Sequence, residues 1–299
     1  PPAWITTPIA RWHKKFYLII VESAFWRSRS RIRQKPQTLL KSWLFEHLNR
    51  WCVNQTDLTI FTQKEYQDSL LTKHPERGHI IHASWINADN ILPEDVAVQL
   101  WQQKQSNRSK SLNIAYAGRL DELKGIPTLL DAIKILNAEG FSIRVDILGD
   151  GDLLAECDKV RSTLRSPTEL CLLGTLPYGP ELFEQMRGYD AVVVPSLSDE
   201  QPRVVYDAYS QAVPVLASDT PGLRDCIQDG ITGKFSPPGN AEALANLFRW
   251  SANHPETLQK MGIDALKVAR SLTHQEMHRR RWELLLEQLG KLNSLEKVK

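Results

Sequence analysis

Two aspartates in the second half of the chain are well suited to hold a sugar. Asp199 lies in an acidic loop, and Asp207 lies eight positions later on an expected helix. A carboxylate accepts hydrogen bonds from two neighbouring hydroxyl groups, so each aspartate suits the vicinal diol of a ribose or a hexose. Read alone, the pair also fits a loop aspartate that caps the helix and a helix aspartate on a solvated face.

Two cations earlier in the chain suit a diphosphate. Arg119 can pair with phosphate oxygens through its planar fork, and Lys124 can do so as a point charge. The plainer alternative is a surface pairing of these cations with Asp121 and Glu122, and for the two cations alone that alternative would be preferred. The diphosphate hypothesis gains weight only when the elements that carry the four residues are considered together.

The elements around the two aspartates read as a strand, a loop, a helix and a second strand. The apolar run 191–194 suits a strand buried on both faces and is stopped by Pro195. Pro202 stands where a helix would begin, and proline is tolerated in a first helical turn. A second apolar strand follows at 213–217. This order is typical of a parallel sheet, which binds phosphorylated ligands at the carboxyl ends of its strands.

Three more strands are expected before this unit, each ending in a glycine-containing loop. They cover 112–117, 143–148 and 170–173, and the loops after them begin with the letters GRL, GDG and GTL. Right-handed crossovers would place these loops beside the acidic loop at one edge of the sheet. Gly118 and Gly149 would allow close backbone approach, and the helix near Pro202 would add its N–H groups. The pattern predicts a nucleotide site.

The first fifty residues are basic and rich in tryptophan. Between Arg11 and Arg50, ten lysines or arginines stand against two acids, Glu22 and Glu46. Apolar positions in 37–52 follow a helical period. A basic helix with tryptophan and leucine on one side can lie on an anionic membrane surface, which predicts such a partner for 11–50. A helix that packs on the core with solvated basic residues is the other interpretation, and both stay open.

The totals bound the class of protein. The 299 residues, 42% apolar and 24% charged, suit two domains of a globular protein. A net charge of +2 does not indicate nucleic acid, and no apolar run approaches the roughly 20 residues of a membrane-spanning helix. The four cysteines lack a CxxC spacing, so no metal site is predicted. We expect a partial N-terminal domain at 1–90, a connection at 91–111, a C-terminal domain at 112–272 and a final helix at 273–299 that packs back on the first domain.

Taken together, four stretches resemble the retaining glycosyltransferases of family 4. They read GRLDELKGIPTLLDAIKIL, VDILGDGDL, PSLSDEQPRVVYDAYSQAVPVLASDTPG and DGITG, and they cover about 112–240 in the order of that family. The resemblance implies an α/β, GT-B fold with two Rossmann-like, doubly wound parallel-sheet domains, the N-terminal one incomplete. It also implies transfer of a hexose from a nucleotide diphosphate sugar with retention of configuration.

The resemblance assigns roles to individual residues. It implies that Asp199 contacts the donor sugar, that Asp207 contacts the nucleotide ribose, and that Arg119 and Lys124 stabilise the diphosphate leaving group. Asp199, Arg119 and Lys124 are thus the catalytic candidates. The residues expected to bind the donor are Gly118, Gly149, Leu176, Glu200, Arg203, Val204 and Asp207. Neither a protein nucleophile nor a metal ion nor a cofactor is expected.

The chain departs from the family pattern at three places. Aspartates replace both glutamates of the donor site, which displaces the diol contacts by about an ångström. The usual glycine-rich tip before the helix reads Glu200-Gln201-Pro202-Arg203. The first domain has about 90 residues where the family usually has about 180, a common domain size. The sequence is therefore expected to be a fragment of a longer protein.

These observations lead to one leading hypothesis and one alternative from another class. The leading hypothesis is a glycosyltransferase that uses a UDP- or GDP-sugar and a glycan or lipid-linked acceptor. It would be cytoplasmic and peripheral on the inner face of a membrane, with no nucleic acid partner. The alternative is a non-catalytic nucleotide-sugar-binding protein or partner subunit of the same fold.

Overall fold

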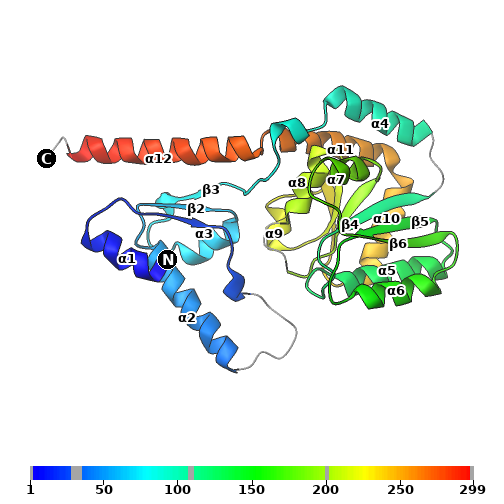
Figure 1. Ribbon diagram of the computed structural model, residues 1–299, viewed down its shortest axis with the longest axis horizontal. Helices are drawn as coiled ribbons and strands as arrows, with labels where there is room; N and C mark the ends of the chain where they lie inside the picture. Colours follow the sequence, from blue (N-terminus) through cyan, green and yellow to red (C-terminus); the bar gives the residue numbers. More distant parts are fainter. Residues whose placement is uncertain (1–2, 28–35, 107–110, 199–201, 297–299) are drawn as a thin grey trace. The chain divides into compact units, whose positions relative to one another are not determined.

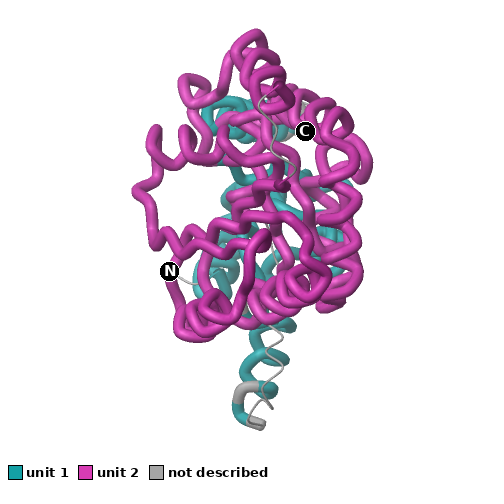
Figure 2. Tube along the Cα trace, turned by 90° about the vertical axis from the view of Figure 1, so that its right-hand side faces the viewer, with its two compact units in different colours: residues 1–84, 274–299 teal, residues 85–273 magenta. Residues whose placement is uncertain are grey.

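The chain forms two α/β units, each built on a parallel sheet. The computed structural model describes residues 3–27, 36–106, 111–198 and 202–296. Unit 1 consists of 1–84 with 274–299, and unit 2 consists of 85–273 (Figure 2). Within the described residues, the sheet of unit 1 has the strand order β1-β2-β3 and that of unit 2 the order β6-β5-β4-β7-β8-β9 (Figure 1). The predicted α/β class with parallel sheets is confirmed.

Unit 2 alternates strands and helices along most of its length. Its strands are β4 (Leu112–Ala117), β5 (Ile143–Leu148), β6 (Thr168–Gly174), β7 (Ala191–Val194), β8 (Val215–Ser218) and β9 (Gly233–Ser236). Its helices are η3 (Ala88–Asn90), α4 (Glu94–Ser106), α5 (Ile126–Ala138), α6 (Leu154–Thr163), α7 (Pro180–Arg187), α8 (Arg203–Ser210), α9 (Pro221–Arg224), α10 (Ala241–Asn253) and α11 (Pro255–Arg270).

The sheet of unit 2 is covered on both faces, and its central strands β4, β5, β7 and β8 are mostly apolar. Ile114 of β4 belongs to a core that includes residues of α5, α6 and α10. The next residue, Ala115, belongs to a second core on the opposite face, with residues of α8 and α11. Successive side chains of a strand point to opposite faces, so the two cores account for the near-continuous apolar runs. The unit is therefore doubly wound.

The stretch expected to connect the domains, 91–111, contributes to the core of unit 2. It contains α4, whose Ala97 and Trp101 are buried. The indole Nε1 of Trp101 donates to the carbonyl oxygen of Ala212 at 2.9 Å. Because α4 buries an apolar face and its indole is hydrogen-bonded, the helix belongs to the core. The polar residues on both sides of α4 are the reason why this stretch resembled a linker in the sequence.

Unit 1 is smaller and is completed by the last helix of the chain. Its elements are α1 (Ala3–Trp12), β1 (Leu18–Val21), η1 (Phe25–Arg27), α2 (Pro36–Val53), β2 (Leu58–Phe61), α3 (Lys64–Leu70), η2 (Pro75–Arg77), β3 (Gly78–Ile80) and α12 (His274–Glu296). One core joins Val21 and Phe61 to residues of α2 and α3. On the other face, Ile60 packs with Met277 and Leu284 of α12.

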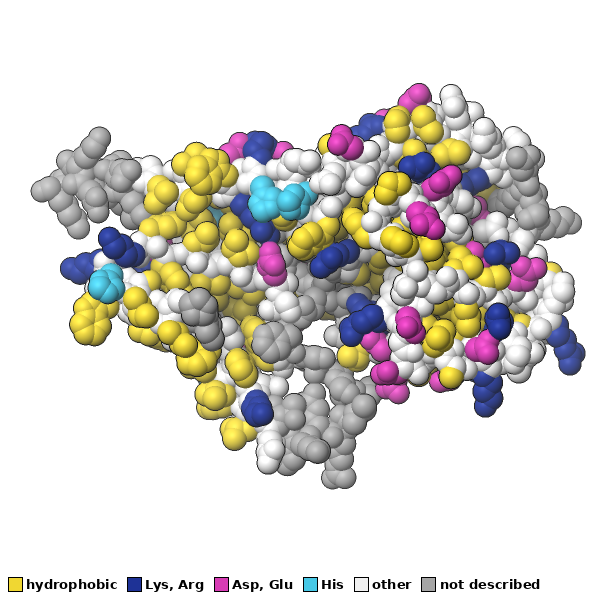
Figure 3. Space-filling view, in the orientation of Figure 1, with side chains coloured by type: hydrophobic (Ala, Val, Ile, Leu, Met, Phe, Trp, Pro, Cys, Tyr) yellow, Lys and Arg dark blue, Asp and Glu magenta, His cyan; other side chains and the backbone are white. Residues whose placement is uncertain are grey.

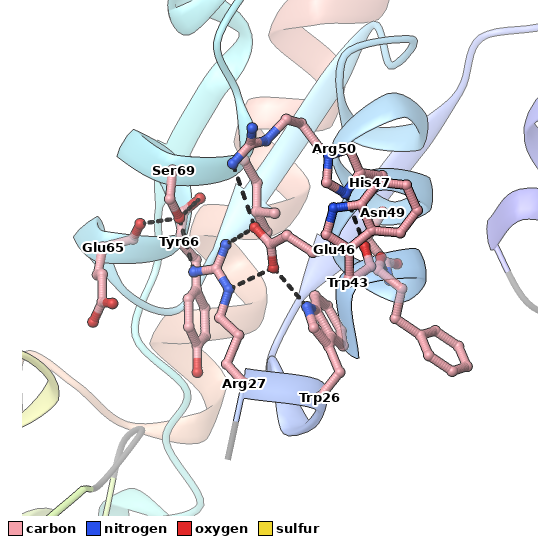
Figure 4. Close-up of polar contacts among 12 residues, drawn as sticks. Trp26, Arg27, Trp43, Glu46, His47, Asn49, Arg50, Glu65, Tyr66 and Ser69 are labelled. Atoms are coloured by element: carbon pink, nitrogen blue, oxygen red, sulfur yellow. Dashed lines mark hydrogen bonds and ion pairs between the residues drawn. The ribbon is translucent and has the colours of Figure 1, made fainter. Parts of the chain in front are cut away.

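The short helix η1 after β1 is bonded to α2 through Glu46 and to α3 through Ser69 (Figure 4). The Glu46 carboxylate accepts hydrogen bonds from Trp26 Nε1 at 2.7 Å and from Arg27 Nε at 2.8 Å. Arg27 Nη1 also donates to Ser69 Oγ of α3 at 2.8 Å. Burial raises the pKa of Glu46, but the bonds from Arg27 and Trp26 and the charges of Arg27 and Arg50 outweigh it and hold that pKa below its usual value. The charges of this cluster are paired, and its role is structural, since it connects η1 to α2 and α3.

Helix α1 was not expected from the sequence. It contains Pro8, together with β-branched Thr6 and Thr7, and such residues argue against a helix. Both threonine hydroxyls lie within hydrogen-bond distance of the Tyr17 hydroxyl, at 2.9 and 3.0 Å. These tertiary contacts hold the segment in place where local preference would not.

The loop after β4 approaches the end of β7 so closely that it requires a glycine. Gly125 precedes α5 with φ +75°, and a Cβ there would lie 1.9 Å from the carbonyl oxygen of Pro195. Gly140 has a similar φ of +67°, but a Cβ there would meet nothing within 4 Å. A side chain would therefore strain the backbone at both positions, but it would clash with a neighbouring atom only at position 125.

We predict that Gly125→Ala destabilises the protein more than Gly140→Ala. The strain of a positive φ costs about 1 kcal/mol at either site, and the clash with Pro195 should add on the order of 2 kcal/mol for Gly125→Ala. Urea unfolding followed by far-UV circular dichroism would measure both changes. Equal midpoints for the two variants would show that the Gly125 loop yields freely and does not fix the end of β7.

Candidate functional site

Four adjacent strands of unit 2 end at the same edge of the sheet. Residues 112–117 of β4 pair in register with residues 143–148 of β5, and Leu148 pairs with Gly174 at the end of β6. On the other side of β4, Ala115 pairs with Val192 of β7. The carboxyl ends of parallel strands meet at one edge, so the loops after β6, β5, β4 and β7 lie side by side as the sequence predicted.

The loops after β4 and β5 approach each other at backbone distance. Gly118 N donates to Leu148 O at 2.9 Å, and Gly149 N donates to Gly174 O at 2.8 Å. A Cβ at position 149 would lie 1.9 Å from the carbonyl oxygen of Gly118. A side chain at position 149 would push the two loops apart, so this glycine allows the ends of β4 and β5 to stay in contact beside the cavity.

A cavity of about 360 Å³ opens at these strand ends, within the size range of small-ligand sites. It is lined by Ala117, Gly118, Arg119, Leu148, Gly149, Asp150, Thr175, Leu176, Leu182, Met186, Val204 and Asp207. The apolar residues provide a surface that suits a flat ring, and the polar ones provide a cation and two carboxylates. Larger hollows of about 560 and 570 Å³ lie elsewhere, one beside α6 and one lined by Asn113 and Arg144 at the amino ends of β4 and β5.

The structure brings six of the predicted site residues into this cavity. They are Gly118, Arg119, Gly149, Leu176, Val204 and Asp207. Lys124 and Arg203 do not line it, and Asp199 and Glu200 lie outside the described residues. Sequence reasoning missed Ala117, Leu148, Asp150, Thr175, Leu182 and Met186. The last two lie on α7, whose amphipathic pattern directly after a strand end could have indicated them.

Asp207 is a buried carboxylate in the wall of the cavity. It lies on α8 and is only 6% exposed, which rules out the solvated helix face considered above. Its Oδ1 accepts a hydrogen bond from the Tyr178 hydroxyl at 3.1 Å. Burial raises the pKa of Asp207 to about 7, although the Tyr178 hydrogen bond and the Arg203 charge offset part of that rise. A carboxylate in a cavity whose pKa lies near 7 is typical of a functional site.

The predicted cations lie on the loop after β4. Arg119 Nη2 is 3.5 Å from Asp121 Oδ2, and its side chain is 78% exposed. That is the surface pairing weighed as the plainer alternative, and such pairs contribute little stability. The backbone nitrogen of Lys124 donates to Asp121 Oδ1 at 2.8 Å, and Leu197 N donates to Leu123 O at 2.8 Å. These bonds hold the Lys124 loop against the start of the loop that carries Asp199.

Arg203 begins α8 and packs on an aromatic ring. Its guanidinium lies 4.3 Å from the ring centroid of Trp85, a cation–π contact. The residue before it, Pro202, is the N-cap of the helix. Arg203 therefore lies close enough to influence Asp207 by its charge, while its side chain stacks on Trp85. Among the described residues, no group of three or more His, Cys, Asp or Glu side chains could hold a metal ion.

Comparisons with known proteins place these features in a family. The family model described as "Glycosyl transferases group 1" matches residues 98–268. The chain is 23% identical over 234 residues to a putative glycosyltransferase EpsD of Bacillus subtilis, which covers 77% of this chain and 61% of EpsD. It is 30% identical over 160 residues to a glycogen synthase of Thermus thermophilus, covering 52% of this chain and 34% of the synthase. The chain thus spans less than two thirds of these relatives' length.

Solved structures share the fold at low sequence identity. HepE of Anabaena in complex with UDP superimposes with a TM-score of 0.72 at 17% identity, covering 95% of this chain and 76% of HepE. Sucrose-phosphate synthase of Thermosynechococcus elongatus gives a TM-score of 0.69 at 18% identity, covering 96% and 72%. Identities this low show the fold alone, and that fold is the predicted GT-B α/β fold. Among its described residues, unit 1 has a three-stranded sheet, which fits the expectation of an incomplete first domain.

The raised pKa of Asp207 predicts a gain in stability on its neutralisation. Since the unfolded value is about 3.9 and the folded value is about 7, the native state binds more protons between these values. Stability should therefore fall as pH rises from about 4 to 7. Asp207→Asn should be more stable than the wild type at pH 8, by on the order of 2 kcal/mol, and the difference should vanish near pH 4.

Thermal unfolding of both proteins between pH 4 and pH 9 would measure this difference. Asp131→Asn, at an exposed residue of α5, is the matched control and should show no comparable pH-dependent gain. A wild type whose stability does not change between pH 4 and 7 would contradict the burial of an ionised Asp207.

Proposed function

Because the chain belongs to the glycosyl transferases of group 1, we propose that it transfers a hexose from a nucleotide diphosphate sugar to a glycan or lipid-linked acceptor. The observation that carries this proposal is the cavity at the ends of β4, β5 and β6, which combines an apolar surface with the buried Asp207. A nucleoside needs both features, a flat apolar contact for the base and an acceptor for the ribose hydroxyls.

Each part of the donor has a suitable place in unit 2. The base would lie against the apolar lining near Leu176 and Val204, and the ribose hydroxyls would bond to Asp207. The diphosphate would meet Arg119 and Lys124 with the N-terminus of α8. The HepE structures with UDP and with UDP-glucose support a UDP-sugar as the first donor to test, with a GDP-sugar as the second.

The chemical contribution of the chain would be electrostatic. Negative charge develops on the departing diphosphate, and cations fixed in advance lower the free energy of that state. Arg119 is available for this role because its exposed pair with Asp121 is weak and can exchange for a phosphate. Asp199 would contact the sugar, and transfer would proceed with retention of configuration and without a cofactor. No protein nucleophile is needed in this scheme.

We propose in addition that unit 1 works at the inner, cytoplasmic face of a membrane. Large apolar side chains are exposed along α1 and α2 (Figure 3). This set of residues, here called the α1–α2 face, consists of Trp4, Ile5, Ile9, Trp12, Leu39, Leu40, Trp43, Leu44 and Trp51. Lys14 and Lys15 follow α1 in the chain, and Lys41 lies on α2. Tryptophan with lysine suits the interface of an anionic bilayer. None of the described helices is both long enough and apolar enough to cross a bilayer.

A nucleotide screen tests the proposed function. We expect calorimetry with UDP, GDP, ADP and dTDP to show binding of one nucleotide, weakened about tenfold or more in Lys124→Ala through loss of a charge worth about 1.4 kcal/mol. Lys134→Ala, at an exposed lysine of α5, is the matched control and should bind normally. Release of free nucleoside diphosphate from the matching sugar donor would then show catalysis. A chain that binds the nucleotide but never releases it from a donor would be the non-catalytic alternative.

Vesicle sedimentation tests the membrane proposal. The wild type should bind vesicles containing phosphatidylglycerol more tightly than vesicles of phosphatidylcholine alone. Replacing Trp12, Leu40 and Trp43 by Gln should abolish that binding, since each buried apolar side chain contributes about 2 kcal/mol. The control replaces Trp282 and Leu286 of α12, which are exposed to a similar degree, and should bind as the wild type does. Absence of wild-type binding to either vesicle would show that the α1–α2 face is not a lipid surface.

A further inference from the structure

Tyr178 lies in the loop between β6 and α7 and has no role in the sequence analysis. Its side chain is 53% exposed, yet its hydroxyl donates to Asp207 Oδ1 at 3.1 Å. Its ring packs edge-on against Phe183, with centroids 5.5 Å apart. One end of the side chain is therefore anchored on α7 and the other on the carboxylate of α8.

The Tyr178 contact is well placed to orient the carboxylate. The terminal torsion of an aspartate is broad, so rotamer preference alone leaves the direction of the two oxygens weakly defined. A hydrogen bond to Oδ1 selects one orientation and leaves Oδ2 for a second donor. An aspartate is one methylene shorter than the glutamate of the family pattern and has one rotatable bond fewer. The positions of its two oxygens therefore depend mainly on the orientation of the carboxylate.

The same contact bears on the charge of Asp207. Burial favours the protonated form, and the Tyr178 hydrogen bond favours the ionised form. Besides Tyr178, the charged or titratable groups around it in the described part of the chain are Arg203 on α8, with Arg119 and Asp150 in the same cavity. Arg203 stacks on Trp85, which leaves Tyr178 as the group in direct contact among the described residues.

We propose that Tyr178 is the positioning residue of the ribose subsite, whose hydroxyl orients the Asp207 carboxylate and keeps it ionised for the ribose hydroxyls of the donor. This inference rests on the proposed function, because it assumes that a nucleotide occupies the cavity. An ionised carboxylate accepts from both hydroxyls of a cis-diol, whereas a protonated carboxyl has one donor and less acceptor capacity. Loss of the Tyr178 hydroxyl should therefore weaken ribose binding most where the carboxylate is close to protonation.

The test compares UDP binding by the wild type and Tyr178→Phe between pH 6 and pH 9 by calorimetry, with GDP in its place if the screen selects it. We expect Tyr178→Phe to bind about three- to tenfold more weakly at pH 7 and to lose clearly less affinity at pH 9, where the carboxylate is ionised in both proteins and only its orientation is lost. The ionisation of the nucleotide itself affects both proteins alike and cancels in the ratio. With the 2′-deoxy nucleotide, the difference between the two proteins should shrink to less than twofold.

Tyr189→Phe is the matched control. The Tyr189 hydroxyl donates to the buried Asp146 at 2.9 Å, outside the cavity, so this variant loses an equivalent bond without touching the subsite. It should keep wild-type affinity at every pH.

The outcomes separate the inference from the function on which it rests. Tyr178→Phe with the affinity and pH profile of the wild type would overturn the inference and leave the function standing. A loss of equal size at all pH values, shared by the deoxy nucleotide, would overturn it as well, since packing alone would account for that loss. Failure of the folded wild type to bind any nucleotide would overturn both.

Discussion

The position of β4 between β5 and β7 is the constraint on which the cavity at the strand ends depends. The chain builds β4, β5 and β6 outward in one direction, then returns to the other side of β4 for β7, β8 and β9. At this reversal the helices that follow the strands leave toward opposite faces, and a crevice remains at the carboxyl ends. Arg119 and Gly149 enter that crevice from one side, and Val204 and Asp207 of α8 enter it from the other. No local motif creates the site without this strand order.

The cavity also shows how stability and binding oppose each other. An ionised aspartate that is 6% exposed destabilises the fold, and an amide in its place would not. The surrounding structure reduces this cost without removing it, through the Tyr178 hydroxyl and the charge of Arg203. A neutral residue would satisfy packing at lower cost, and this cost is consistent with the proposed role of Asp207 as an acceptor for the ribose hydroxyls. The same reasoning does not apply to Glu46, whose partners Arg27 and Trp26 already satisfy it.

The sequence predicted the parts of the site that follow from periodicity. The apolar runs of β4, β5 and β7 were found at their observed positions, and parallel topology then brought Gly118, Gly149 and Asp207 together. Contacts made by single side chains from irregular segments could not be predicted. Tyr178 is bonded to Asp207 because the loop after β6 turns toward α8, and Arg203 stacks on Trp85 from a distant segment. No pattern in the sequence encodes either pairing.

The allocation of residues between the units bears on the proposed reaction. Every residue that lines the cavity belongs to unit 2, as do Lys124 and Arg203. Under the proposed function, nucleotide affinity is therefore a property of that unit, set by strand order, the apolar lining and one oriented carboxylate. The proposed transfer also requires a place for the acceptor, whereas the cavity residues Leu176, Val204 and Asp207 are assigned to the donor. A variant that loses transfer and keeps nucleotide binding would therefore identify a residue on the acceptor side of the proposed reaction.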